Sequence, residues 1–227
     1  MGGRFRAVVF DLDGVLWDGE PLYQRAFNAV LGPLGHALDD ETYRRDIAGL
    51  SVEESWQRVR ERLSLSAPLD GLLAAYHRAV LGLLAEGVEP LPGARELVGR
   101  LRELGVPLAV ASSSRREWVE ATLRGLGLQG AFGAVVTASE VERAKPAPDL
   151  YLAAARALGV PPQRCIAIED TPTGLRAARA AGMRAVQLRA ASYSFPPQPQ
   201  AELVLDSLWD FDISLLQAGT PAEGRNP

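Results

Sequence analysis

The chain has 227 residues, of which 47% are hydrophobic and 23% are charged, enough apolar material for one large domain or a main domain with a smaller one. Its formal net charge of -4 and the lack of a basic tract argue against nucleic acid or an anionic membrane as the main partner, so a small molecule is expected. Cys165 is the single cysteine, and no stretch has the length of a membrane span or the layout of a secretory signal. We therefore expect a cytoplasmic protein. We also expect it to be a monomer or a weak dimer.

Short apolar runs, typical of buried strands, alternate with amphipathic segments along most of the chain. The amphipathic segments show a helical period and close on glycine, as helix C-termini often do. This alternation predicts an α/β fold, a Rossmann-like parallel sheet with helices on both faces. The predicted strands are 7–10, 107–111, 134–137, 165–168, 185–188 and 203–205.

Residues 18–88 break this alternation, because they contain helix-like segments and no convincing strand. They predict an all-helical cap inserted directly after the first strand, with residues 17–18 and 88–90 as hinges. The Rossmann-like core then comprises 1–17 and 89–216. The remaining residues, 217–227, are rich in Gly, Pro and polar side chains and are expected to form a flexible tail.

Two acids, Asp11 and Asp13, follow the first apolar run. Side chains two apart on a strand point to the same side, so these carboxylates repel each other unless something positive lies between them. Ligands of open parallel sheets bind at the carboxyl ends of the strands, where other polar residues are expected to join the two acids. Clustered carboxylates suit Mg²⁺, and hydroxyls and an ammonium suit a phosphate that completes its coordination. The other residues at this edge are Ser112, Ser113, Lys145, Glu169 and Asp170.

Lys145 stands out in the composition. The chain has 24 lysines and arginines, and Lys145 is the single lysine, which leaves 23 arginines. An isolated lysine is ordinarily a solvated surface charge. In a background that otherwise uses arginine, however, a lone lysine near the acids indicates that a compact ammonium is needed there rather than a planar guanidinium.

The motifs DLDGVL, ASSS, KPAPD and EDTPTG occur in this order, with a predicted helical cap after the first. In this the chain resembles the haloacid-dehalogenase-like hydrolase superfamily, in its helical-cap branch of phosphatases and β-phosphoglucomutase-like enzymes. The resemblance extends to about residue 215. It implies a Mg²⁺-dependent phosphatase that hydrolyses a small phosphorylated metabolite, such as a sugar phosphate or a phosphoglycolate-like compound, through an aspartyl-phosphate.

The resemblance also implies a role for each motif residue. Asp11 corresponds to the nucleophile and a metal ligand, and Asp13 to the general acid and base, whose main-chain carbonyl also binds the metal. Asp170, with Glu169 beside it, completes the metal site. The transferring phosphoryl group is expected on Ser112, the backbone N–H of Ser113, and Lys145.

Two other functions stay open, a phosphosugar mutase and, more distantly, a non-catalytic binding protein with this fold. Mutases of this type carry a lysine and an arginine where this chain has Ala48 and Val52, and a threonine where it has Gly19, which favours the phosphatase. Trp17 and Tyr23 flank the entrance to the predicted site and are possible substrate contacts. Ser114 is expected to cap the helix that follows it.

Overall fold

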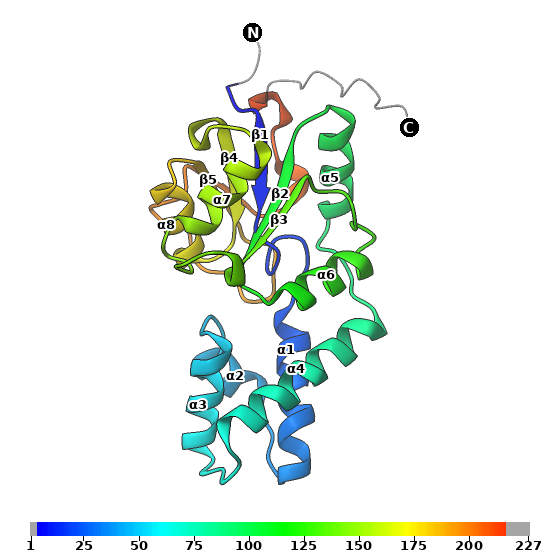
Figure 1. Ribbon diagram of the computed structural model, residues 1–227, viewed down its shortest axis with the longest axis vertical. Helices are drawn as coiled ribbons and strands as arrows, with labels where there is room; N and C mark the ends of the chain where they lie inside the picture. Colours follow the sequence, from blue (N-terminus) through cyan, green and yellow to red (C-terminus); the bar gives the residue numbers. More distant parts are fainter. Residues whose placement is uncertain (1–3, 217–227) are drawn as a thin grey trace. The chain divides into compact units, whose positions relative to one another are not determined.

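The computed structural model describes residues 4–216, which divide into two compact units (Figure 1). Residues 4–18 and 89–216 form one, which we call the sheet unit, and residues 19–88 form the other, which we call the helical unit. The predicted tail, 217–227, lies outside the described residues. Among residues 4–216, no helix combines the length and the hydropathy that crossing a membrane requires.

The sheet unit is built on six strands in the order β3-β2-β1-β4-β5-β6, and every neighbouring pair is parallel. The predicted fold class is therefore confirmed, as is each predicted strand to within one residue. The chain leaves β1 toward β2 and β3 and then crosses back to β4, so the strand order reverses between β1 and β4. The bounds are β1 Ala7–Phe10, β2 Leu108–Ser112, β3 Ala134–Thr137, β4 Cys165–Glu169, β5 Arg184–Leu188 and β6 Leu203–Leu205.

Helices cover both faces of this sheet (Figure 1). On one face α7 packs across β1, β2 and β3, while α8 packs on β4 and β5 and also contacts α7. The core beneath these two helices is rich in alanine, whose small side chains let helix and sheet backbones approach closely. α5 packs against β2 on the other face, and α6 connects β2 to β3. The bounds are α5 Ala94–Glu103, α6 Arg116–Gly125, α7 Asp149–Leu158 and α8 Pro172–Ala180.

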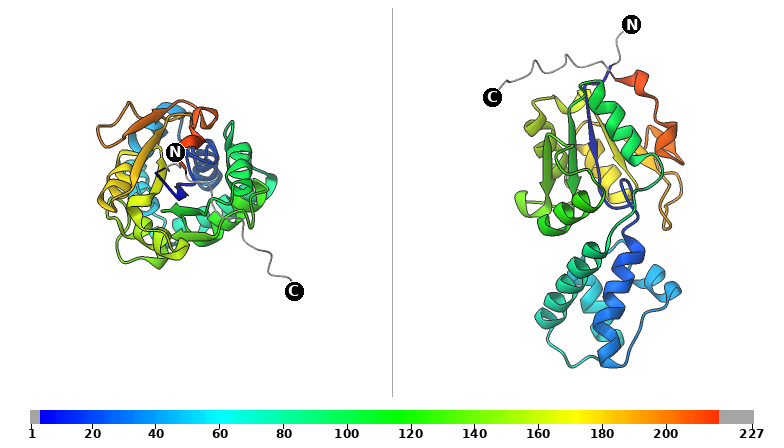
Figure 2. Two further views of the ribbon diagram at one scale, coloured as in Figure 1. Left: turned by 90° about the horizontal axis from the view of Figure 1, so that it is seen from above. Right: turned by 90° about the vertical axis from the view of Figure 1, so that its right-hand side faces the viewer.

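Residues 19–88, all of which the structure describes, form helices and no strand. α1 runs beside α4, visible in the right-hand view of Figure 2, and α3 also packs on α4. Local sequence sets where α3 begins, because Ser51 and Glu54 form a reciprocal capping box at its N-terminus. The bounds are α1 Glu20–Leu31, α2 Asp40–Asp46, α3 Val52–Arg62 and α4 Leu69–Glu86.

An aromatic cluster forms the core of the helical unit. The ring of Phe27 lies at the centre, with ring centroids 4.6 Å from Trp56, 4.5 Å from Tyr76 and 6.0 Å from Tyr43. The four rings come from α1, α2, α3 and α4, and each side chain is almost completely buried. One cluster thus ties together every α-helix of this unit.

The two segments that join the units pair where they leave the sheet unit. The backbone N–H of Leu91 donates to the carbonyl of Leu16 at 2.9 Å, and Trp17 forms an antiparallel bridge with Pro90. The outgoing and returning segments therefore start side by side. The hinge role of residues 17–18 and 88–90 stays a prediction.

Candidate active site

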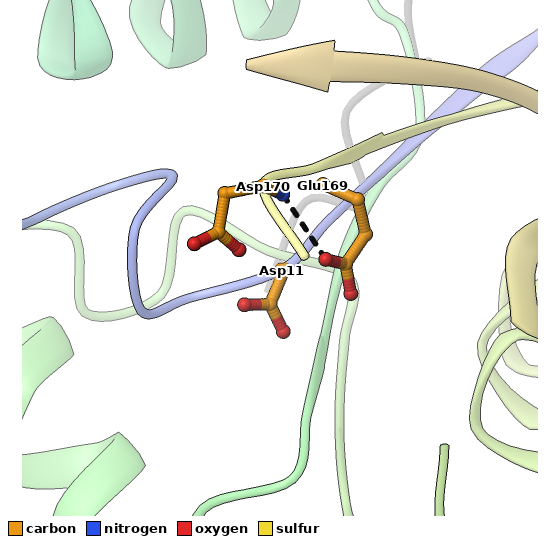
Figure 3. A group of neighbouring side chains, drawn as sticks. All are labelled: Asp11, Glu169 and Asp170. Carbon is orange, nitrogen blue, oxygen red and sulfur yellow. Dashed lines mark hydrogen bonds between the residues drawn. The ribbon is translucent and has the colours of Figure 1, made fainter. Parts of the chain in front are cut away.

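Three acidic side chains meet at the carboxyl ends of β1 and β4. Asp11 follows β1, Glu169 ends β4 and Asp170 comes next, and the pairing of the two strands brings them together. One carboxylate oxygen from each lies within 4.8 Å of the others, and all three residues are buried. Figure 3 shows this group. So many buried acids are unfavourable unless positive charge compensates them.

Lys145 supplies part of this positive charge. Its Nζ lies 2.5 Å from Oδ1 of Asp11 and 2.5 Å from Oε1 of Glu169, and 7% of its side chain is exposed. Burial alone would lower the pKa of Lys145, but the charges of Asp11 and Glu169 outweigh it and hold this pKa above the ordinary value. Burial likewise raises the pKa of Glu169, but the ion pair with Lys145 prevails and keeps it below the usual range. The pair is therefore an ammonium and a carboxylate.

The charges of Asp11 and Asp170 are compensated less well. Burial raises the pKa of Asp11 to about 8, although the ammonium of Lys145 opposes this. Burial, followed by repulsion from Glu169 and Asp11, raises the pKa of Asp170 well above its usual value. Among residues 4–216, the buried Oδ1 of Asp170 has no hydrogen-bond partner. An unsatisfied carboxylate oxygen beside a second acid fits a hard divalent cation held by oxygen ligands.

Glu169 differs from Asp170 in its hydrogen bonds. Its Oε1 accepts from Lys145 and from the hydroxyl of Tyr151, at 2.5 and 2.8 Å. Its Oε2 accepts from the backbone N–H groups of Asp170 and Thr171 and from the Thr171 hydroxyl, at 3.0–3.1 Å. Consecutive side chains at a strand end point to different sides, as Figure 3 shows for these two acids. Glu169 therefore faces the lysine and already accepts five hydrogen bonds.

Two glycines make room for these acids. A Cβ on Gly14 would lie 2.1 Å from Oδ2 of Asp170, and the φ of +76° at Gly14 also disfavours a side chain. A Cβ on Gly174, in the first turn of α8, would lie 1.8 Å from Oε1 of Glu169. Both carboxyls thus pack directly on backbone. Neither glycine stands out from the sequence as part of the site, although Gly14 belongs to the DLDGVL motif and Gly174 to the EDTPTG motif.

The loop after β2 meets the loop after β1 at Asp13. Ser112 is buried, and its Oγ accepts from the backbone N–H of Ser114 at 3.0 Å, whereas Ser113 is exposed. The hydroxyl of Ser114 donates to Oδ2 of Asp13 at 2.9 Å. The expectation that Ser114 caps the next helix is wrong, because the N-cap residue of α6 is Arg115 and no side chain caps it. Ser114 instead orients Asp13.

The two aromatic candidates occupy different units. Trp17 belongs to the sheet unit, where 3% of it is exposed and its carbonyl accepts from the N–H of Gly14 at 2.8 Å. Tyr23 lies on α1 in the helical unit. Their contact with substrate stays a prediction. The sequence does not point to Tyr151 as a site residue. Its spacing on the predicted helix indicates a position in the core, but the spacing cannot show which group the hydroxyl of Tyr151 contacts.

Comparisons with known proteins show which family and which solved structures this chain resembles. A family model of haloacid dehalogenase-like hydrolases matches residues 5–182. Fructose-1-phosphate phosphatase YqaB of Escherichia coli (strain K12) is 37% identical over 192 residues, covering 82% of this chain and 97% of that protein. The crystal structure of CbbY from Rhodobacter sphaeroides in complex with phosphate has a TM-score of 0.77 and 32% identity, covering 91% of this chain and 96% of that one. A β-phosphoglucomutase from Clostridium difficile has a TM-score of 0.76 and 25% identity, covering 92% and 94%.

Proposed function

Because this chain belongs to the haloacid dehalogenase-like hydrolase family, we propose that it hydrolyses a small phosphorylated metabolite of the sugar-phosphate class through an aspartyl-phosphate on Asp11. The predicted family and the enzyme class, a phosphoric monoester hydrolase, are confirmed by its relatives. The observation that carries the proposal is the contact of Lys145 with Asp11 inside the buried acidic group.

Asp11 is the proposed nucleophile. Its carboxylate oxygen attacks phosphorus and forms a new O–P bond, while the bond from phosphorus to the oxygen of the leaving alcohol breaks. The pKa of Asp11 stays high even with the ammonium of Lys145 beside it, so further positive charge is needed to keep this carboxylate ionised. Lys145 can also stabilise the negative charge on the transferring phosphoryl oxygens.

Asp13 is the proposed general acid and base. Two residues after Asp11 and oriented by Ser114, its carboxyl protonates the departing alcohol and then removes a proton from the water that attacks the aspartyl-phosphate. That attack releases inorganic phosphate and restores Asp11. Ser112 and the backbone N–H of Ser113 are the proposed anchors for the phosphoryl group.

Magnesium is the proposed cation, since Mg²⁺ prefers carboxylates and substrate phosphate over an all-protein cage. Asp11, Asp170 and the main-chain carbonyl of Asp13 would hold it, with the unsatisfied Oδ1 of Asp170 as the strongest support. When bound, the ion neutralises carboxylate charge and polarises phosphoryl oxygens. Glu169, predicted from the sequence as a further ligand, is here a weaker candidate, since Lys145, Tyr151 and the start of α8 already engage both of its oxygens.

The helical unit is the proposed cap that selects the substrate and excludes water. Val52 is the first residue of α3 and Ala48 lies just before its N-cap, and neither carries a charge that could hold a second phosphate. This supports the hydrolysis of a monophosphate over phosphosugar mutation. The cytoplasmic location and the monomeric or weakly dimeric state stay predictions.

Release of inorganic phosphate from a panel of sugar phosphates, hexitol phosphates and phosphoglycolate tests the proposal. We expect turnover of at least one compound with Mg²⁺, loss of turnover with EDTA, and recovery when Mg²⁺ is restored. Phosphate release that persists in a metal-free preparation would contradict the role of the metal. Conversion of a sugar phosphate to its isomer without net phosphate release would establish the mutase instead, and inactivity on every compound would contradict the hydrolase.

A further inference from the structure

Tyr151 contacts both members of the Lys145–Glu169 ion pair. It lies in the first turn of α7 and is completely buried. Its hydroxyl donates to Oε1 of Glu169 at 2.8 Å, and the centre of its ring lies 5.3 Å from Nζ of Lys145. The ammonium is therefore in contact range of both the ring face and the carboxylate that the hydroxyl engages.

The hydroxyl fixes the direction of the Glu169 carboxylate. Oε2 is already held by the backbone and side chain at the start of α8, so the remaining freedom of the carboxylate is at Oε1. There the Tyr151 hydroxyl and the Lys145 ammonium occupy the two acceptor positions of one oxygen. Without the hydroxyl, this oxygen could move relative to the lysine.

The lysine side chain needs such support. It is long and flexible, and two of its three N–H donors go to Asp11 and Glu169, which leaves the third for a phosphoryl oxygen. The placement of that third donor depends on where the other two are held. The carboxylate oxygen of Asp11 must move toward phosphorus during the reaction. Of the two acids that bind Lys145, Glu169 is therefore the one that stays in place.

We propose that Tyr151 is a positioning residue for Lys145. Through its hydrogen bond to Glu169 and through the face of its own ring, Tyr151 holds the Lys145 ammonium where Asp11 and the transferring phosphoryl group need it. This inference rests on the proposed function for its effect on rate, but the position of Lys145 can be measured without substrate. A purely structural role is the alternative, in which the hydroxyl only satisfies its own hydrogen bond in the core.

The Tyr151→Phe variant keeps the ring and removes the hydroxyl. We expect kcat to fall roughly 10-fold, less than the about 10²-fold that a 1 Å misplacement can cost, while KM and the Mg²⁺ concentration for half-maximal rate stay within about twofold. Tyr43→Phe is the matched control, because Tyr43 is also buried and its hydroxyl donates to Oε2 of Glu20 at 2.7 Å in the helical unit. This control should keep the wild-type kcat.

The single lysine of the chain gives a second measurement that needs no activity. Protein labelled with ¹⁵N-lysine and ¹³C-lysine, without a lysine-containing tag, has one set of side-chain NMR signals, that of Lys145. We expect the Nζ and Cε shifts of Lys145 to change in Tyr151→Phe, and exchange of its ammonium protons with water to become faster. Tyr43→Phe should leave these signals in place.

The results separate the two proposals. Unchanged Lys145 signals in Tyr151→Phe would overturn the positioning role, whatever the activity of the protein. Wild-type kcat in this variant, or a loss confined to the Mg²⁺ requirement, would overturn it as well. An inactive wild type whose Lys145 signals nevertheless shift in Tyr151→Phe would refute the phosphatase and leave the positioning of the lysine supported.

Discussion

Both units of the molecule have ion pairs on the surface, but among residues 4–216 only the sheet unit has ion pairs with both side chains buried. In the helical unit, ion pairs lie on the surface, as with Arg25 and Glu86, whose side chains are 61% and 62% exposed. In the sheet unit, the pair of Lys145 and Asp11 has side chains only 7% and 9% exposed. Burying charge in this way costs desolvation energy that a surface pair does not lose. Such a cost is typical of a site that has a chemical task.

The interior of the helical unit is an aromatic cluster. Phe27 and the three rings around it supply apolar area and no charge, which is a direct way to stabilise a small helical bundle. Beneath α7 and α8 the sheet unit packs mostly small aliphatic side chains, and at the strand ends it also buries three acids. Substitutions of the buried acids and Lys145 should therefore change activity, whereas substitutions in the aromatic cluster should change stability.

The largest effect is expected from Asp11→Asn, which removes the nucleophile and retains the size of the side chain. Turnover should fall by more than about 10⁴-fold, measured as phosphate release on the best substrate of the panel. Asp46→Asn, which removes a partly buried partner of the exposed Arg45 and Arg62 in the helical unit, is the control and should leave kcat unchanged. An Asp11→Asn variant that turns over at the wild-type rate would move the nucleophile elsewhere.

A substitution in the aromatic cluster should come next and should act on stability. Phe27→Ala removes the ring that contacts three others, so we expect the free energy of unfolding to fall by about 3–5 kcal/mol. Urea denaturation followed by circular dichroism measures this. Leu34→Ala, at a position 43% exposed in the same unit, should cost less than about 0.5 kcal/mol. Equal losses in the two variants would show that the cluster does not form the core.

Lys145→Arg tests whether the buried ion pair needs a compact ammonium. A planar guanidinium should displace the phosphoryl group, and a displacement of about 1 Å can lower kcat by about 10²-fold. The reverse exchange in the same loop, Arg143→Lys, affects a surface pair with Asp149 and should change kcat by less than about twofold. Full activity in Lys145→Arg would show that charge alone is sufficient at this position.

The smallest effect is expected at the surface pair of Arg25 and Glu86. A double-mutant cycle with Arg25→Ala and Glu86→Ala should give a coupling energy of about 0–1 kcal/mol, which decreases as salt is added. Urea titrations at low and high ionic strength measure it. A coupling well above this range that persists in high salt would mean that the contrast between buried and exposed charge is smaller than the structure indicates.

The sequence predicts the sheet well because each strand is a short apolar run and most of these runs are followed by a helical segment. In a parallel sheet the carboxyl ends of the strands also converge at one edge. For this reason the amino-acid pattern alone points to Asp11, Lys145 and Asp170. The roles of adjacent acids are harder to predict from the sequence. Glu169 and Asp170 are both acids at a strand end, and only the structure shows that their side chains point to different sides. The glycine at 174 and the hydroxyl of Tyr151 depend on contacts across the fold, which no periodicity reports.

The paired segments at Leu16–Leu91 and Trp17–Pro90 bear on how such a molecule can diversify. Since both ends of the helical unit are anchored next to each other, the whole insertion can be shortened, enlarged or exchanged without moving a strand of the sheet. With the cap role proposed for the helical unit, selection for a new substrate can act on residues 19–88 while the buried charges are inherited unchanged. For the same reason, grafting a helical unit from a relative between residues 18 and 89 is a practical route to chimeric enzymes with altered substrate range.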